Sequence, residues 1–256
     1  MNPLEEPILK YIIWFLVCVF SSVITAISGG GGMLSLPVLI SLGLPEAVLL
    51  GTNKAVLTTG TLTATIRYIK SGVVKFNRLL ITSCFISFFA AIGGAECSRY
   101  LDTQWMLYLL LFIISSLFCI EFLKKRHPQK EKNKAKTPLL FIYLTVISMG
   151  FYNGFFGPGT GVISFFLFSY LTPMKVMESV AFSKTIAVVS SLTAFAYFTY
   201  LGRIDWSYAG IGILGAIIGS WTGAGIALKV DSKKVKIFFN VILSIFLIKI
   251  LFDIFY

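Results

Sequence analysis

The chain has 256 residues, of which 57% are hydrophobic and only 13% are charged. Soluble domains carry roughly 25% charged residues, so the composition excludes an ordinary soluble protein and indicates a chain that crosses a membrane many times. The net charge of +11 does not predict nucleic-acid binding, because most of the basic residues flank apolar segments, as membrane topology signals do.

Ten apolar segments follow one another along the chain and leave no room for a soluble domain. Eight of them are long enough to cross about 30 Å of hydrocarbon at about 1.5 Å per residue. The second and the seventh are shorter, and they predict half-helices, re-entrant hairpins or short spans. The ten segments are 8–27, 33–43, 46–69, 78–98, 104–123, 138–156, 160–171, 175–201, 206–228 and 235–256.

The two sets of five segments form an internal repeat. Pro45 and Pro173 are 128 positions apart, and after a two-residue change in length Lys54 and Lys184 are 130 positions apart. Because glycine, proline, lysine and segment lengths recur in one order, the match is stronger than glycine content alone could produce. The matched glycines are Gly31 with Gly159, Gly72 with Gly202, and Gly93 with Gly223.

The repeat predicts an all-α integral membrane protein built from two inverted repeats of five helical segments, with eight to ten transmembrane helices. Residues 1–123 form the N-terminal transmembrane repeat, residues 124–137 a basic cytoplasmic linker, and residues 138–256 the C-terminal transmembrane repeat. With the linker in the cytoplasm, ten crossings place the basic cluster at 229–236 inside, whereas eight crossings place it outside. The positive-inside rule therefore favours ten crossings, which give the two halves opposite orientations.

Each half contains a glycine-rich break just before its short segment. The first, at 29–32, is four consecutive glycines, and the second, at 157–161, reads Gly-Pro-Gly-Thr-Gly. Inside a helix each glycine costs about 1 kcal/mol against alanine, and broken backbone at membrane depth occurs only where protein buries it or where it lines a cavity. Free N–H groups at helix starts favour anions, so the breaks predict an anion site. The alternative is a tight connection at which small residues let helices approach.

Each half also carries a lysine within an apolar segment. Lys54 and Lys184 lie at similar depths, roughly 12 Å along their helices. A lysine at the centre of a membrane costs about 2.5–3.5 kcal/mol on insertion scales, so a matched pair is rarely accidental. Inverted repeats bring the two ammonium groups together near the midplane, where they can hold an anion. The alternative is that each lysine pairs with an acid, such as Glu96 or Glu178, or extends to the membrane surface.

These features resemble the TauE/SafE family of sulfite exporters, also called the toluene sulfonate uptake permease family, over about residues 10 to 250. The resemblance implies transport of sulfur-containing anions, such as sulfite, thiosulfate, sulfoacetate and other sulfonates, across the bacterial inner membrane. Members of the family differ in substrate. It rests on the breaks at 29–32 and 157–161, on Pro37, on the run Gly51-Thr52-Asn53-Lys54, and on Ser183-Lys184.

We therefore expect a secondary transporter that exports sulfite or a related small sulfur-containing or organosulfonate anion across the bacterial inner membrane. The alternatives are an anion channel and a membrane scaffold or enzyme without transport. Catalysis and metal binding lack support, since the chain has one histidine and four scattered cysteines, and no cofactor is expected. The expected partners are the anion and the lipid bilayer, without nucleic acid, and a homodimer is left open. The residues expected to bind the anion are Gly30, Gly31, Gly32, Thr52, Asn53, Lys54, Gly157, Gly159, Thr160, Ser183 and Lys184.

Overall fold

The computed structural model describes residues 5–27, 29–74, 76–100, 138–172 and 174–230, together with the single residues 105, 108, 112, 115 and 241. Within these ranges every regular element is a helix, as the sequence predicts. The predicted segments 104–123 and 235–256 and the linker 124–137 lie outside the described residues, apart from those single positions.

The described helices follow the predicted segments closely. The first half contributes α1, α2, α3, α4 and a short 3-10 turn, η1, and the second half contributes α6, α7, α8 and α9. Both short segments are short helices, of 10 residues in α2 and 12 in α7. The bounds are α1 Glu5–Ile27, α2 Gly32–Ser41, α3 Glu46–Lys70, α4 Arg78–Cys97, η1 Ser98–Tyr100, α6 Leu139–Phe155, α7 Thr160–Leu171, α8 Val176–Tyr200 and α9 Trp206–Lys229.

Four described helices are long and apolar enough to cross a membrane: α1, α4 with η1, α8 and α9. Helix α3 has the same 25-residue length as α8, but it carries Lys54, Arg67 and Lys70 and six threonines. Most of these threonines are buried against other helices, so the polar sequence of α3 reflects its place inside the bundle. Several membrane-spanning helices make this a multi-pass membrane protein.

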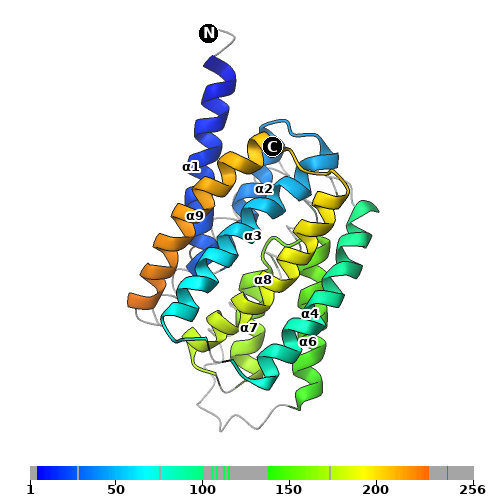
Figure 1. The fold of residues 1–256 in the computed structure, drawn as a ribbon, viewed down its shortest axis with the longest axis vertical. Helices are drawn as coiled ribbons and strands as arrows, with labels where there is room; N and C mark the ends of the chain where they lie inside the picture. The colour runs from blue at the N-terminus through cyan, green and yellow to red at the C-terminus, as the bar shows by residue number, and fades with distance from the viewer. Residues whose placement is uncertain are drawn as a thin grey trace.

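Helices α3 and α8 contact each other at the centre of the molecule, with α1 and α9 on one side and α4 and α6 on the other (Figure 1). In this view α3 runs toward the lower left and α8 toward the upper right, so their chain directions are opposite. The most extensive packing joins the two halves, because α1 contacts α9 and α4 contacts α6. The halves are therefore interleaved rather than placed side by side as separate bodies.

Glycines let the helices of the two halves approach each other closely. On α9, three glycines spaced by four residues face the backbone carbonyls of α1, and a Cβ atom on any of them would crowd a carbonyl oxygen. Without hydrophobic attraction between helices in lipid, such close packing is a main source of helix association. The facing pairs are Gly215 with Phe15, Gly219 with Val19, and Gly223 with Val23.

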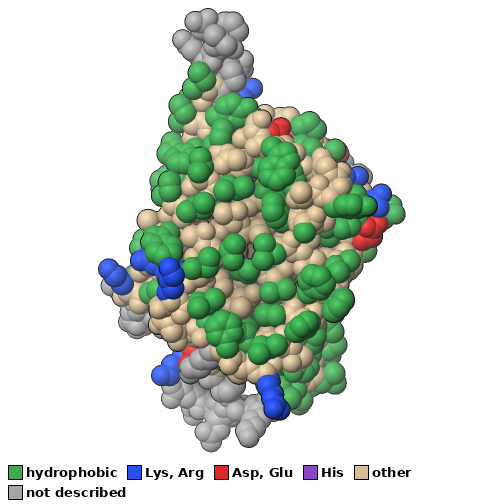
Figure 2. All heavy atoms as spheres, in the orientation of Figure 1, with side chains coloured by type: hydrophobic (Ala, Val, Ile, Leu, Met, Phe, Trp, Pro, Cys, Tyr) green, Lys and Arg blue, Asp and Glu red, His purple; other side chains and the backbone are tan. Residues whose placement is uncertain are grey.

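The outer surface is apolar and the interior contains many polar side chains, as expected for a protein surrounded by lipid. In Figure 2 hydrophobic side chains are spread over the whole visible face, while charged side chains lie toward its margins. Large side chains such as Phe85 and Phe89 are two-thirds exposed, whereas Lys54 and Lys184 are each only 2% exposed. The two lysines are thus deeply buried.

Candidate functional site

The two glycine-rich breaks touch each other inside the bundle. A Cβ atom on Gly29 would overlap the Cα atom of Gly161, and a Cβ atom on Gly161 would overlap that of Gly29. Gly29 and Gly157 also have φ angles of 85° and 97°, in the left-handed region that only glycine enters without strain. Glycine at these positions therefore permits both the turn of the chain and the close approach of the two halves.

Each buried lysine crosses to the break of the other half. The Lys54 ammonium on α3 donates to the backbone carbonyl of Asn153 and to its Oδ1 atom, the latter at 3.2 Å. The Lys184 ammonium on α8 donates to the backbone carbonyl of Thr25. Thr25 and Asn153 are 128 positions apart, the separation of the matched prolines. The two lysine contacts are therefore counterparts in the repeat.

A cavity of about 30 Å³ lies between the two breaks and the central helices. Its lining is built from both halves, because ten of its twelve residues form five pairs with the repeat separations of 128 or 130. Helix α2 begins at Gly32 and α7 begins at Thr160, so both short helices start at the cavity. The pairs are Thr25 with Asn153, Gly29 with Gly157, Gly32 with Thr160, Leu57 with Ala187, and Thr61 with Ser191, and Gly161 and Lys184 complete the lining.

The cavity combines positive charge with hydrogen-bonding groups and has no carboxylate in its lining. Lys184 supplies an ammonium group, and Thr25, Thr61, Thr160 and Ser191 supply hydroxyl groups. The dipoles of α2 and α7 add partial positive charge at the helix starts. Among the described residues no group of three histidine, cysteine or acidic side chains could hold a metal ion. The chemistry of the lining therefore suits an anion.

Asn153 is the most heavily bonded side chain beside the cavity. Its Nδ2 group lies within hydrogen-bond distance of the hydroxyls of Ser190 at 2.6 Å and Ser191 at 2.9 Å, and of the Ala187 carbonyl at 3.2 Å. Its Oδ1 atom accepts from Lys54 and from Thr160. Asn153 thus ties α3, α7 and α8 to the end of α6.

The structure brings part of the predicted residue set to the cavity. Gly32, Gly157, Thr160 and Lys184 line it. Lys54 is not in the lining, but its ammonium occupies the space beside Gly157, where a Cβ atom would otherwise lie. The remaining glycines, Gly30, Gly31 and Gly159, belong to the breaks without lining the cavity.

Three other predicted side chains are engaged away from the cavity. The Thr52 hydroxyl accepts from the backbone N–H of Asp205 at 2.9 Å and donates to the Val48 carbonyl. Asn53 accepts from the Ser35 hydroxyl at 2.6 Å. Ser183 donates to the Val180 carbonyl within its own helix. Thr52 and Asn53 thus bond α3 to neighbouring elements, whereas Ser183 bonds only within α8 among the described residues.

Sequence reasoning missed several residues that line the cavity. Thr25 and Asn153 each precede the left-handed glycine of a break by four positions, and Thr61 and Ser191 each follow the buried lysine by seven. The sequence does contain a signal for these four residues, since they are polar residues within apolar segments and are paired at the repeat separations of 128 and 130. The other lining residues outside the predicted set are Gly29, Leu57, Gly161 and Ala187.

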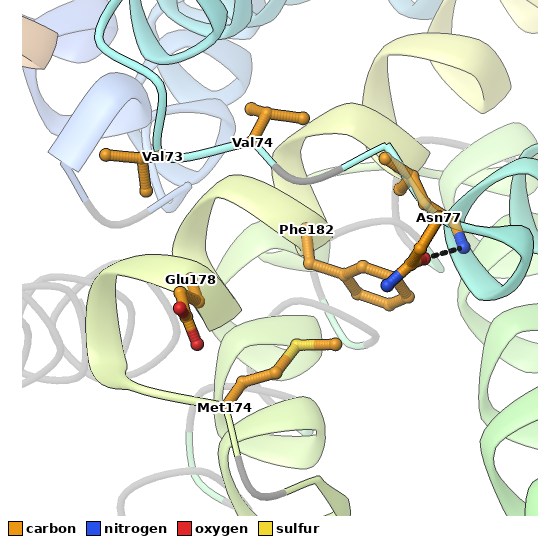
Figure 3. A pocket seen from close by; sticks show the side chains of 7 residues that line it. Val73, Val74, Asn77, Met174, Glu178 and Phe182 are labelled. Atoms are coloured by element: carbon orange, nitrogen blue, oxygen red, sulfur yellow. Dashed lines mark hydrogen bonds between the residues drawn. The ribbon is translucent and has the colours of Figure 1, made fainter.

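A second pocket, of about 100 Å³, lies where the connection between α3 and α4 meets the start of α8 (Figure 3). Its polar side chains cap helices, because Asn77 Oδ1 accepts from the N–H of Leu80 at 2.8 Å and Glu178 accepts from the N–H of Lys175 at 3.1 Å. Its lining contains no lysine or arginine, so it does not suit an anion. The lining residues are Val73, Val74, Asn77, Leu80, Met174, Glu178 and Phe182.

Comparisons with known proteins agree with a transporter. The chain is 30% identical over 212 residues, covering 83% of both chains, to a probable membrane transporter protein of Haemophilus influenzae. It is 29% identical over 224 residues to the probable membrane transporter protein ORF9 of Sinorhizobium sp, covering 87% of this chain and 85% of the relative. It is 24% identical over 250 residues to the probable membrane transporter protein YfcA of Escherichia coli, covering 97% of this chain and 91% of that protein.

No solved structure is a significant match. The family model described as sulfite exporter TauE/SafE matches residues 14–250, which is nearly the whole chain and nearly the range that the breaks and lysines indicate. The family and the names of the relatives identify a membrane transporter rather than an enzyme. The chain belongs to the sulfite exporter TauE/SafE family.

Proposed function

We propose that the cavity between the two breaks binds a small sulfur-containing oxyanion, and that the protein carries this anion across the membrane as a secondary transporter. The observation that carries the proposal is the convergence of a buried lysine and the starts of α2 and α7 on one cavity without a carboxylate. In a site removed from water, such fixed positive charge attracts an anion far more strongly than it does in bulk solvent.

The size of the cavity agrees with transport by conformational change. Its volume of about 30 Å³ is enough for about one or two ordered water molecules. An anion with four or more heavy atoms therefore requires the breaks and the central helices to separate. Binding and helix movement are then coupled, as a carrier requires, whereas a channel needs a continuous path.

Sulfite or a short organosulfonate is the proposed substrate, and export across the bacterial inner membrane is the proposed direction. The support is the description of the matching family as sulfite exporters, together with the anionic chemistry that the lining suits. The relatives are named only as probable membrane transporters.

Flux through proteoliposomes containing the purified full-length protein tests the proposal. Labelled sulfite and short sulfonates should cross at a saturable rate, and an unlabelled anion on the opposite side should accelerate the exchange. Chloride, phosphate and sulfate serve as controls. No flux of any sulfur anion above empty liposomes contradicts the transport proposal, and flux that rises linearly without saturation favours the channel alternative.

Proton coupling is the proposed source of energy. The sequence has no ATPase motif, and an anion leaving the cytoplasm requires charge balance. An imposed pH gradient should therefore change the initial rate of sulfite flux at constant membrane potential. A rate that does not respond to the gradient, or that requires ATP, contradicts this coupling.

A further inference from the structure

Lys54 and Lys184 occupy matched positions in the sequence repeat, but the hydrogen bonds around the two lysines differ. At one end Lys54 donates twice to Asn153, and the Asn153 side chain also bonds Thr160, Ser190 and Ser191. At the other end Lys184 donates to the Thr25 carbonyl, its one acceptor among the described residues. An ammonium group carries three donors, so Lys184 retains donors for a ligand.

Thr25 adds a second, independent observation at the Lys184 end. Thr25 belongs to the cavity lining and is only 4% exposed. Its hydroxyl oxygen lies beside Gly31, just before α2, and has no hydrogen-bond partner among the described residues. A buried hydroxyl without a partner is destabilising, and such groups in native proteins call for an explanation such as a ligand. In the other half the corresponding residue is Asn153, whose side chain is fully engaged.

We infer that the transported anion binds at the Thr25–Lys184 end, and this inference rests on the proposed function. One oxygen of the anion accepts from the Lys184 ammonium and a second accepts from the Thr25 hydroxyl. The ligand is a small oxyanion with at least two acceptor oxygens, such as sulfite or the head of a sulfonate. Gly29 assists by presenting no side chain, since a Cβ atom there would lie 3.0 Å from the Lys184 ammonium nitrogen.

Lys54 and Asn153 act as positioning residues in this arrangement. Lys54 does not line the cavity, and two of its three donors are already used by Asn153. Widening the cavity at that end would break bonds to three helices. At the Thr25 end Lys184 has one acceptor among the described residues, the Thr25 carbonyl, so an anion there replaces fewer hydrogen bonds of the buried lysine.

Sulfite affinity of the full-length protein in nanodiscs, measured by titration calorimetry, tests the inference. Thr25→Val should weaken binding by about tenfold or more, the loss expected for one hydrogen bond to a charged group, and Thr25→Ser should restore affinity. Thr65→Val is the matched control, because Thr65 is also a buried threonine whose hydroxyl has no partner, at 3% exposure, but it does not line the cavity. It should leave the affinity unchanged.

The lysines provide the second comparison. Lys184→Gln should abolish sulfite binding, whereas Lys54→Gln should retain binding while lowering the melting temperature and the maximal transport rate. Equal loss of binding in the two folded variants, or unchanged affinity in Thr25→Val, overturns the inference while leaving the proposed function standing. A wild-type protein that neither binds nor moves any sulfur anion overturns both. If Lys184→Gln does not fold, the Thr25 series alone decides.

Discussion

Gly157 shows how one missing side chain positions a buried charge. Its φ angle of 97° favours glycine, and the Lys54 ammonium occupies the space that a Cβ atom would take. Two constraints, one on the backbone and one on packing, therefore coincide at this residue. A glycine that has a positive φ angle but open space at its Cβ position allows the two constraints to be separated.

Gly157→Ala should lower the melting temperature more than Gly72→Ala. Gly72 also has a positive φ, of 73°, but nothing lies within 4 Å of its Cβ position. Both variants incur the strain of a left-handed residue, about 1–2 kcal/mol, which lowers the melting temperature of a protein of this size by roughly 2–8 °C. Only Gly157→Ala also displaces Lys54. Equal shifts, measured by thermal unfolding in detergent, contradict the packing role.

The sequence predicts which lysines are buried but not what each one contacts. The apolar residues around each lysine, together with the repeat, predict that both lysines are buried. The acceptors of Lys54 and Lys184 lie 99 and 159 positions away, and a separation in sequence carries no information about such contacts. Thr52, Asn53 and Ser183 lie beside the lysines in the sequence, but neighbouring residues on a helix point in different directions.

Glycines on the two faces of helix α9 have different surroundings. Gly219 packs against the carbonyl of Val19 on α1, whereas a Cβ atom on Gly210 would have nothing within 4 Å. The same chemical change on one helix should therefore have opposite effects at the two positions.

Gly219→Ala should destabilise the protein, and Gly210→Ala should stabilise it slightly. Alanine is favoured over glycine within a helix by about 1 kcal/mol, and at Gly210 nothing opposes this gain. At Gly219 the added methyl group must push α1 away from α9. Melting temperatures of the two variants in one detergent provide the test, and a gain in both would show that α1 and α9 do not depend on this contact.

Helix bounds were largely predictable because apolar length and helix breakers determine them. The starts and ends of α3, α7 and α9 lie within one residue of the predicted segments. The neighbours of each helix were not predictable, because glycine spacing on α9 indicates close packing without naming the partner. Only the structure shows that α1 of the first half packs on α9 of the second.

The sequence repeat predicts that the molecule has two inverted halves and crosses the membrane ten times. The end of α3 lies beside α9, since the Arg67 guanidinium carbon is 4.9 Å and the Lys70 nitrogen 5.7 Å from the centre of the Trp221 ring. Arginine and lysine at the end of a membrane-spanning helix are typical of a membrane boundary. Basic residues at this end of α3, together with Lys229 at the end of α9, favour a cytoplasmic location.

Cysteine labelling with an impermeant reagent in a variant without native cysteines tests this topology. Lys70→Cys and Lys229→Cys should react only from the cytoplasmic side, and Arg203→Cys, just before α9, only from the outside. The control is a cysteine within the linker 124–137, which should label with the cytoplasmic pair. Labelling of Lys229→Cys from outside contradicts the ten-crossing arrangement.

The crossed lysine contacts have a consequence for biosynthesis. Lys54 is made 99 residues before its acceptor Asn153, and at about 5–20 residues per second the ribosome needs on the order of 5–20 s to supply it. During that interval α3 holds a lysine whose acceptor does not yet exist, at an insertion cost of about 2.5–3.5 kcal/mol. A nascent chain stopped before residue 138 should therefore leave α3 poorly inserted and open to membrane proteases, and translation through α6 should rescue it.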